Sequence, residues 1–334
     1  MREIRLACSG YTAEAGNDVL TVCLSREGKA KVEGGIRQGG SPSWILKKDG
    51  FLYMVSEQTE RAAIGRRRVR EDGSLGEEEG RIALPGGELC HLWEGETALY
   101  ASCYGTGDFF AVDYGLKKIL WHRKPEDVAH CGGAEDGARP HAHWASQQED
   151  ILYLSDLGRD RIYRYRMANG LPEEELNPIR LPEGAGPRQL LPLTENLLLS
   201  VQELDGTLRL WRYEGSDRTT TPACVQTVQA TGEQGINYPG TACMADAHTV
   251  LVCNRGANTV AAFSVKEEKL NRIGEWETGN WPRHLSQVPG TNLVVNACNR
   301  EGVLNVFAWE ENRLQKRDEI VLSGASCAQV LCNG

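Results

Sequence analysis

The chain has 334 residues and a formal net charge of −9, which argues against sequence-independent binding to nucleic acid or acidic lipid because both are polyanions. Its residues are 40% hydrophobic and 25% charged, as in globular proteins, and no apolar run approaches the ~20 residues of a membrane span. The N-terminal segment MREIRLACSG lacks the apolar core of a signal peptide. We therefore expect a cytoplasmic protein with no nucleic-acid or membrane partner.

The eleven cysteines and seven histidines do not form the pattern of a disulfide framework or a zinc site. The cysteine count is odd, and cysteines such as Cys23 in VLTVCL and Cys253 in VLVCN lie within apolar runs, where they behave as small hydrophobic residues. The histidines cluster only at His141 and His143, without further ligands at zinc spacing. We expect free thiols, no metal and no other cofactor.

Short strands separated by turn residues begin at the N-terminus. The segment REIRLACSGY (2–11) is followed by DVLTVCLS (18–25), and neither shows the 3.6-residue periodicity of a helix. Together they match a repeat found further along the chain, but without its first strand. They indicate that the chain begins with the second strand of a repeat unit.

Six copies of a unit of about fifty residues follow, and a period of this length is typical of propellers and solenoids. Each unit has a Gly/Pro turn, an apolar strand, a polar turn, a strongly apolar strand, a polar pair and an alternating strand. The regular spacing counts against a β-sandwich, which needs no fixed period. In chain order the copies lie at residues 41–58, 86–114, 139–166, 186–213, 238–265 and 281–309.

The C-terminal segment GASCAQVLCNG indicates the opening strand of a unit that then stops. We predict that residues 324–332 form the innermost strand of a blade whose other strands come from residues 2–40. Joining both ends in one blade leaves no exposed sheet edge. The sequence therefore predicts an all-β fold, a seven-bladed β-propeller formed by residues 1–334 as a single domain, with its ring closed by the N-terminal strands and a C-terminal innermost strand.

Short polar motifs occur in order at the blade spacing. The motifs are Arg139-Pro140-His141-Ala142-His143, Ser155-Asp156-Leu157-Gly158 with Asp160-Arg161-Ile162-Tyr163, Gly186-Pro187-Arg188, Glu203-Leu204, Asn254-Arg255-Gly256 and Pro282-Arg283-His284. In these motifs the chain resembles the lactonase family of seven-bladed propellers, which includes propeller-type 6-phosphogluconolactonases and a fungal carboxymuconate-lactonising enzyme. The resemblance covers nearly the whole chain.

The chain departs from the family pattern at a few positions. The family usually has His after the Gly-Pro-Arg triplet, where this chain has Gln189, and it often has Asn where this chain has Cys103, Gln202 and Cys298. We expect these positions to lie beside the site, so the substrate is left open.

Antiparallel pairing brings several polar residues to one edge of the blades, because the first strand begins where the second strand ends. Arg188 opens a first strand and Glu203 ends the next strand, and similar placements bring further residues to the same channel mouth. We predict His143, Arg188, Glu203 and Arg255 as catalytic residues, four positions that the resemblance also implies. The predicted substrate-binding residues are Tyr104, His141, Asp156 and Arg283.

Such a set suits the hydrolysis of a sugar lactone or another small anionic lactone, the activity that the resemblance implies. Arginines bind anionic groups and stabilise an oxyanion, and either Glu203 or His143 takes the proton of an attacking water. The alternatives are a lyase that closes a lactone, and a propeller that only binds a partner. A structural ion pair between Arg188 and Glu203, and a turn-capping role for Asp156, also remain open. The sequence leaves the oligomeric state undetermined.

Overall fold

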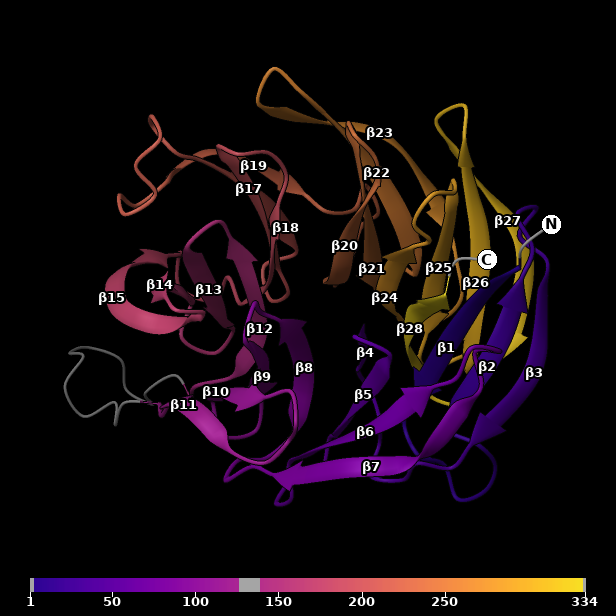
Figure 1. The fold of residues 1–334 in the computed structure, drawn as a ribbon. Helices are drawn as coiled ribbons and strands as arrows, with labels where there is room; N and C mark the ends of the chain where they lie inside the picture. Colours follow the sequence, from indigo (N-terminus) through magenta and orange to yellow (C-terminus); the bar gives the residue numbers. More distant parts are fainter. Residues whose placement is uncertain (1–2, 126–138, 333–334) are drawn as a thin grey trace.

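The computed structural model describes residues 3–125 and 139–332, and in them the chain forms seven four-stranded sheets. Figure 1 shows the sheets set around one central axis, as the blades of a propeller. The predicted all-β fold, a seven-bladed β-propeller, is therefore confirmed. The described residues contain no helix that is long and apolar enough to cross a membrane.

In three consecutive blades the chain passes from the channel outward, and each strand pairs with the next one in a hairpin. The strands are β4 (Ile45–Lys48), β5 (Phe51–Ser56), β6 (Ala63–Val69), β7 (Leu75–Ala83), β8 (Leu89–Glu94), β9 (Ala98–Cys103), β10 (Asp108–Asp113), β11 (Ile119–Arg123), β12 (Ala142–Gln148), β13 (Ile151–Asp156), β14 (Arg161–Ala168) and β15 (Leu171–Arg180).

The next three blades repeat this arrangement. Their strands are β16 (Pro187–Pro192), β17 (Leu197–Gln202), β18 (Thr207–Arg212), β19 (Ala223–Gln229), β20 (Tyr238–Asp246), β21 (Thr249–Arg255), β22 (Thr259–Lys266), β23 (Lys269–Glu277), β24 (Pro282–Gln287), β25 (Leu293–Cys298), β26 (Val303–Glu310) and β27 (Arg313–Val321).

The seventh blade joins the two ends of the chain and closes the ring (Figure 1). Its strand order is β28-β1-β2-β3, and β1 pairs antiparallel with both β2 and β28. The prediction that a C-terminal strand forms the innermost strand beside the N-terminal strands is confirmed. The strands are β1 (Ile4–Gly10), β2 (Val19–Leu24), β3 (Ala30–Ile36) and β28 (Ala325–Cys332).

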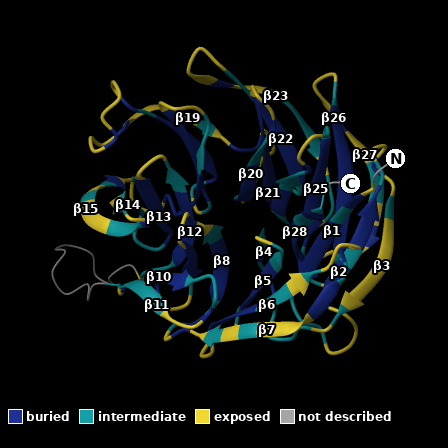
Figure 2. Cartoon of the chain, viewed as in Figure 1, coloured by how far each residue is buried: buried dark blue, intermediate teal, exposed yellow. Residues whose placement is uncertain are grey.

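Burial follows the order of the strands in each blade, as Figure 2 shows. Second strands such as β13 and β17 are buried along their whole length, whereas outer strands such as β3 and β19 are mostly exposed. This explains the sequence pattern, because a strand covered on both faces needs a continuous apolar run. The core lies between neighbouring blades, where burial of apolar surface drives the packing.

A β-bulge recurs where the innermost strand begins. It falls at His143 in β12 and at Arg188 in β16, each of which is skipped in the pairing with the second strand. A bulge turns a side chain away from the direction that regular pleating would give it. The seven equivalent residues, here called the bulge ring, are Ser43, Cys90, His143, Arg188, Gly240, Arg283 and Ser326; a register shift is recorded at six of them, all but Ser43.

The residue that follows each bulge connects neighbouring blades. Gln189 bonds the backbone of Ala242 in the next blade twice, since its Oε1 accepts from the amide at 2.6 Å and its Nε2 donates to the carbonyl at 3.1 Å. Thr241 Oγ1 likewise accepts from the Leu285 amide at 2.8 Å. These seven residues, here called the belt, are Trp44, His91, Trp144, Gln189, Thr241, His284 and Cys327.

The belt accounts for one departure from the family pattern. His91 uses its Nδ1 atom to accept from the Ala145 amide of the next blade at 3.3 Å, so a His and a Gln serve the same purpose at this position. Because Gln189 is committed to an interface between blades, its presence gives no reason to expect a different substrate.

Candidate active site at one mouth of the channel

One backbone hydrogen bond recurs at the same end of the blades and fixes which residues meet there. The Glu203 amide donates to the Gly186 carbonyl at 2.8 Å, and the Glu57 amide donates to the Ser41 carbonyl at 3.2 Å. The residues that follow or end the second strands, here called the strand-end ring, are Tyr11, Glu57, Tyr104, Leu157, Glu203, Arg255 and Asn299. We call this end of the channel the mouth.

Arg188 lies at the centre of the predicted catalytic set. Its Nη1 atom is 2.6 Å from His143 Nε2 and also 2.6 Å from Glu203 Oε2. The prediction from hairpin geometry that Arg188 and Glu203 are neighbours is therefore correct. The Arg188 side chain is 5% exposed and that of Glu203 is 17% exposed, so the ion pair is largely shielded from solvent.

Arg255 reaches the same carboxylate from the next blade. Its Nη2 atom is 2.7 Å from Glu203 Oε2, and it also donates to the Pro239 carbonyl at 3.0 Å. Its Nε atom donates to the Tyr238 carbonyl at 2.9 Å. Backbone carbonyls thus fix the position of Arg255, and Glu203 Oε2 forms ion pairs with two guanidinium groups.

These charges determine how Glu203 ionises. Burial alone would raise the pKa of Glu203, but the guanidinium groups of Arg188 and Arg255 outweigh it and lower that pKa to about 2. Burial and the charge of Arg188 lower the pKa of Arg255 to about 10, against the effect of Glu203. Glu203 and Arg255 are therefore both charged near neutral pH.

His143 is a neutral acceptor in this arrangement. Burial, followed by the charge of Arg188, lowers the pKa of His143 well below its usual range. An arginine can only donate, so His143 Nε2 accepts the hydrogen bond and the ring proton is assigned to Nδ1. Among the described residues, His143 Nδ1 has no hydrogen-bond partner. The lone pair that a base would need is thus bound to Arg188.

Tyr104 and His141 form one side of the mouth. Their rings stack with centroids 4.3 Å apart, and His141 Nδ1 donates to the Tyr104 carbonyl at 2.9 Å. The Tyr104 ring also meets His143 edge-on, with centroids 6.0 Å apart. Two predicted substrate-binding residues therefore contact each other next to a predicted catalytic residue.

Asp156 differs from the other predicted site residues. Its side chain is fully buried, and its Oδ1 atom accepts from the amides of His141 at 2.9 Å and Arg159 at 3.2 Å. Asp156 pairs with Ala142, whereas Leu157 is the residue in the strand-end ring. A shift of one position moves a side chain to the other face of a strand. Asp156 therefore makes the contacts of a turn cap that holds His141.

Arg283 lies in the mouth among residues that the sequence reasoning missed. Its Nη2 atom is 3.7 Å from Glu57 Oε2, and its guanidinium lies 5.3 Å from the centre of the Tyr11 ring. The Tyr11 hydroxyl is 2.9 Å from both oxygens of Glu57, and the Ser43 hydroxyl also donates to Glu57. Burial and the charge of Glu57 raise the pKa of Tyr11, although Arg283 opposes them.

The sequence did contain a signal for Glu57 and Tyr11. Glu57 follows the apolar strand FLYMVS just as Glu203 follows LLLSVQ, and Tyr11 follows the strand IRLACSG. Aligning the ends of the second strands would have identified both residues.

The belt closes the channel beneath the mouth with aromatic rings. The Trp44 ring lies 4.6 Å from that of His91, 5.2 Å from Trp144 and 4.9 Å from His284, and the His91 and Trp144 rings stack at 3.8 Å. The cavity between belt and mouth measures only about 10 Å³, enough for about one water molecule. A ligand larger than a water molecule therefore does not fit in this cavity.

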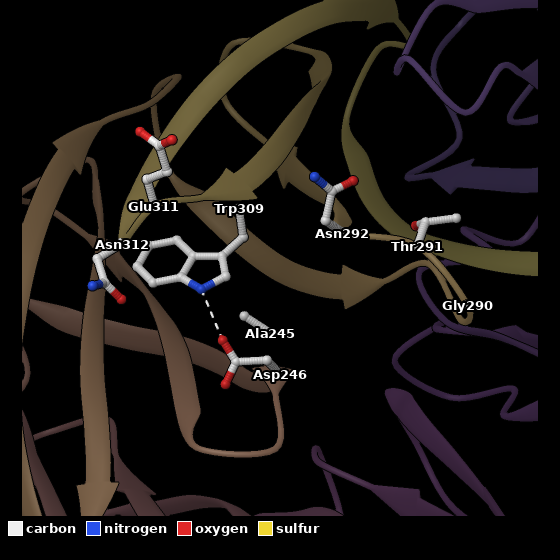
Figure 3. A pocket seen from close by; sticks show the side chains of 8 residues that line it. All are labelled: Ala245, Asp246, Gly290, Thr291, Asn292, Trp309, Glu311 and Asn312. Atoms are coloured by element: carbon white, nitrogen blue, oxygen red, sulfur yellow. Dashed lines mark hydrogen bonds between the residues drawn. The ribbon is translucent and has the colours of Figure 1, made fainter.

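A larger hollow lies elsewhere, between two blades and on the turns at the opposite end of the strands. It measures about 660 Å³, and Figure 3 shows its side chains, with Trp309 donating to Asp246 at 3.0 Å. Its charged lining residues are Asp246 and Glu311, both acidic. It therefore lacks the cationic groups that an anionic ligand requires.

The described residues offer little to bind a metal. Their one close group of three potential ligands is Glu3, Cys23 and Glu33, where Glu33 already pairs with Arg5 at 3.1 Å. It lies on the β1–β3 sheet and includes no residue of the mouth. The ten described cysteines are unpaired, and Cys131 lies outside the described residues.

The fold and the mouth define a propeller with three arginines and two carboxylates gathered at one end of a closed channel. Comparison with known proteins gives the family. The family model described as "Lactonase, 7-bladed beta-propeller" matches residues 5–329, and the chain belongs to this family.

Individual relatives cover the chain almost completely. It is 26% identical to a 6-phosphogluconolactonase of Bacillus subtilis, over 96% of this chain and 95% of the relative. A solved structure from Lactobacillus plantarum is similar with a TM-score of 0.88 and 18% identity, covering 98% of this chain and 99% of that one. A periplasmic gluconolactonase of Pseudomonas aeruginosa is similar with a TM-score of 0.85 and 18% identity, covering 99% of both chains.

Proposed function

We propose that this protein hydrolyses a small anionic lactone, with a 6-phosphogluconolactone-like sugar lactone as the leading substrate class, and that the reaction takes place at the mouth. Membership of the lactonase family supports the reaction class. The similarity to a 6-phosphogluconolactonase supports the sugar lactone.

The observation that carries the proposal is the convergence of Arg188 and Arg255 on one oxygen of Glu203, at 2.6 and 2.7 Å. With Arg283 included, three positive groups meet the two negative groups Glu203 and Glu57 in the mouth. This excess of positive charge suits an anionic substrate. Guanidinium groups also bind oxyanions through paired donors.

In the proposed reaction a water oxygen bonds to the lactone carbonyl carbon, and the negative charge that develops on the carbonyl oxygen is stabilised by Arg188 and Arg255. The ring C–O bond then breaks and the ring oxygen takes a proton, which gives the hydroxy acid. Glu203 holds both guanidinium groups in place, so the donors need no reorganisation during the reaction.

The test is an assay of purified protein against phosphorylated and unphosphorylated aldonolactones, with the spontaneous ring opening subtracted. We expect catalysed hydrolysis, with a preference for the phosphorylated lactones. Arg188→Lys and Arg255→Lys keep one charge but lose the planar pair of donors, so each should lower kcat/KM by about 10²–10³.

Arg212→Lys is the matched control, because Arg212 pairs with Glu268 through exposed side chains on an outer surface. This variant should keep the wild-type kcat/KM. If folded wild-type protein accelerates no lactone in the panel, the proposal is wrong and a propeller that only binds a partner becomes the better interpretation. Near-normal activity in both mouth variants would refute the roles given to the arginines.

A further inference from the structure

Glu57 occupies the same position in its blade as Glu203 does in the third blade after it. Each donates its amide to the carbonyl that opens its unit: Glu57 to Ser41, sixteen positions upstream, and Glu203 to Gly186, seventeen positions upstream. Both carboxylates therefore belong to the strand-end ring. They differ in what binds them, and this difference decides what each can do.

Glu203 and His143 are both engaged by Arg188. The Glu203 carboxylate is within 2.7 Å of two guanidinium groups, whose positive charges reduce its affinity for a proton. His143 directs its Nε2 lone pair at Arg188. The two residues that sequence reasoning considered as the base are thus both poor proton acceptors in this arrangement.

Glu57 is bound mainly by neutral hydroxyl groups. Tyr11 and Ser43 donate to it, and the Arg283 guanidinium approaches only to 3.7 Å, beyond hydrogen-bond distance. A carboxylate offers about four lone-pair sites, and Glu57 Oε1 receives one bond from the described residues, that of Tyr11. The Glu57 side chain is 16% exposed, close to the 17% of Glu203, so the two carboxylates differ in their partners and not in their exposure.

We propose that Glu57 is the general base of the lactone hydrolysis, a proposal that rests on the function proposed above. Glu57 accepts a proton from the attacking water as the water oxygen bonds to the carbonyl carbon. When the ring C–O bond breaks, protonated Glu57 returns that proton to the ring oxygen. The sum is lactone plus water giving hydroxy acid, with Glu57 unchanged and no other reactant consumed.

The other residues near Glu57 do not compete for the proton. Burial, followed by the charge of Glu57, raises the pKa of Cys90 to about 12, so this thiol is neutral. Tyr11 donates to Glu57 and has a raised pKa. Acidic Glu57 and Tyr11 raise the pKa of Arg283 in spite of its burial, so this guanidinium keeps its charge. Neither the Cys90 thiol nor the Tyr11 hydroxyl is therefore an alternative base, and the acid limb of the pH–rate profile serves as the readout in the experiment below.

The experiment compares Glu57→Gln, Glu57→Asp and Glu203→Gln in the full-length protein, using the lactone that wild type hydrolyses fastest. Glu57→Gln keeps the shape but cannot accept the proton, so kcat should fall about 10²–10⁴-fold and the acid limb should disappear. Glu57→Asp should retain the acid limb with a lower kcat. Glu203→Gln should lower kcat/KM by disturbing the arginines, but it should retain the acid limb.

Glu311→Gln is the control, since Glu311 lines the hollow at the opposite end of the strands and should leave kcat unchanged. Melting temperatures separate loss of fold from loss of chemistry. If wild type is active and Glu57→Gln stays folded with its acid limb intact, Glu57 is not the base although the proposed function stands. Loss of the acid limb in Glu203→Gln instead would assign the base to Glu203. An inactive wild type would overturn both proposals.

Discussion

In each blade a residue of the bulge ring is followed directly by a residue of the belt, and the two side chains make different kinds of contact. Arg188 carries two contacts in the mouth, while Gln189 bonds the backbone of the next blade. His143 contacts Arg188, while Trp144 stacks on His91. A one-residue step along the strand thus separates side chains that lie at the mouth from side chains that join the blades. The comparison teaches that changes in the two layers should have separable effects on activity and on stability.

The comparison depends on a closed ring, so removing the closing strand should have the largest effect. Deletion of residues 324–334 removes β28 and exposes the edge of β1, which β28 pairs along its length. We expect loss of cooperative folding, measured as the absence of a sharp thermal transition by circular dichroism. A melting transition like that of the full chain would contradict this role for β28.

One variant in the belt and one in the bulge ring should next distinguish an effect on stability from an effect on activity. Trp144→Ala removes a buried ring that contacts Trp44 and His91, so the free energy of unfolding should fall by about 3–5 kcal/mol. Arg188→Lys should change the free energy of unfolding much less, although it lowers kcat/KM. Urea unfolding of both variants provides the measurement, and equal losses of stability would show that the two layers are not distinct.

Gln189→Leu should have a smaller effect than the loss of the tryptophan. It removes two hydrogen bonds and leaves the amide and carbonyl of Ala242 without their side-chain partner, at a cost of about 1–3 kcal/mol for unsatisfied buried groups. The kcat on the best lactone should be retained. A large loss of kcat with unchanged unfolding free energy would instead place Gln189 in the site.

The smallest effect concerns pH. Burial, followed by the charge of Arg283, lowers the pKa of His284 from 6.5 to about 3. As pH falls through this interval the unfolded chain binds a proton that the folded chain does not, so stability is lost with decreasing pH. Between pH 7 and 5.5 the free energy of unfolding should decrease by about 1 kcal/mol less in His284→Gln than in the wild-type protein. The exposed His248→Gln is the control, and equal losses in both variants would argue against a buried neutral His284.

The sequence was sufficient for the fold because the repeat specifies strands, turns and closure together. Hairpin geometry also predicted that Arg188 and Glu203 are neighbours, whereas the contacts of His143 and Arg255 with them join different blades and were not predicted. The sequence left open whether Asp156 caps a turn or binds substrate, because the pairing register at the end of β13 cannot be read from composition. The bulges were equally hidden, because the backbone shift at His143 and Arg188 depends on packing against neighbouring blades.

Glu57 shows a different limit of sequence reasoning. Its position was available from the repeat, but its importance depends on which groups contact it. These come from the residue after β1, from β24 and from the turn before β4. No spacing rule predicts that Tyr11 and Ser43 bind this carboxylate while two arginines bind Glu203. The chemical difference between two equivalent carboxylates emerges only from the assembled ring.

The bulges also limit which side chains the channel can hold beneath the mouth. At Gly240 an added Cβ would lie 2.7 Å from the Arg283 carbonyl oxygen. Ser43, Cys90 and Ser326 are small and belong to three consecutive blades. All three are buried, so larger side chains there would overpack the channel wall, and exchange of Ser43 would also remove a hydrogen-bond donor to Glu57.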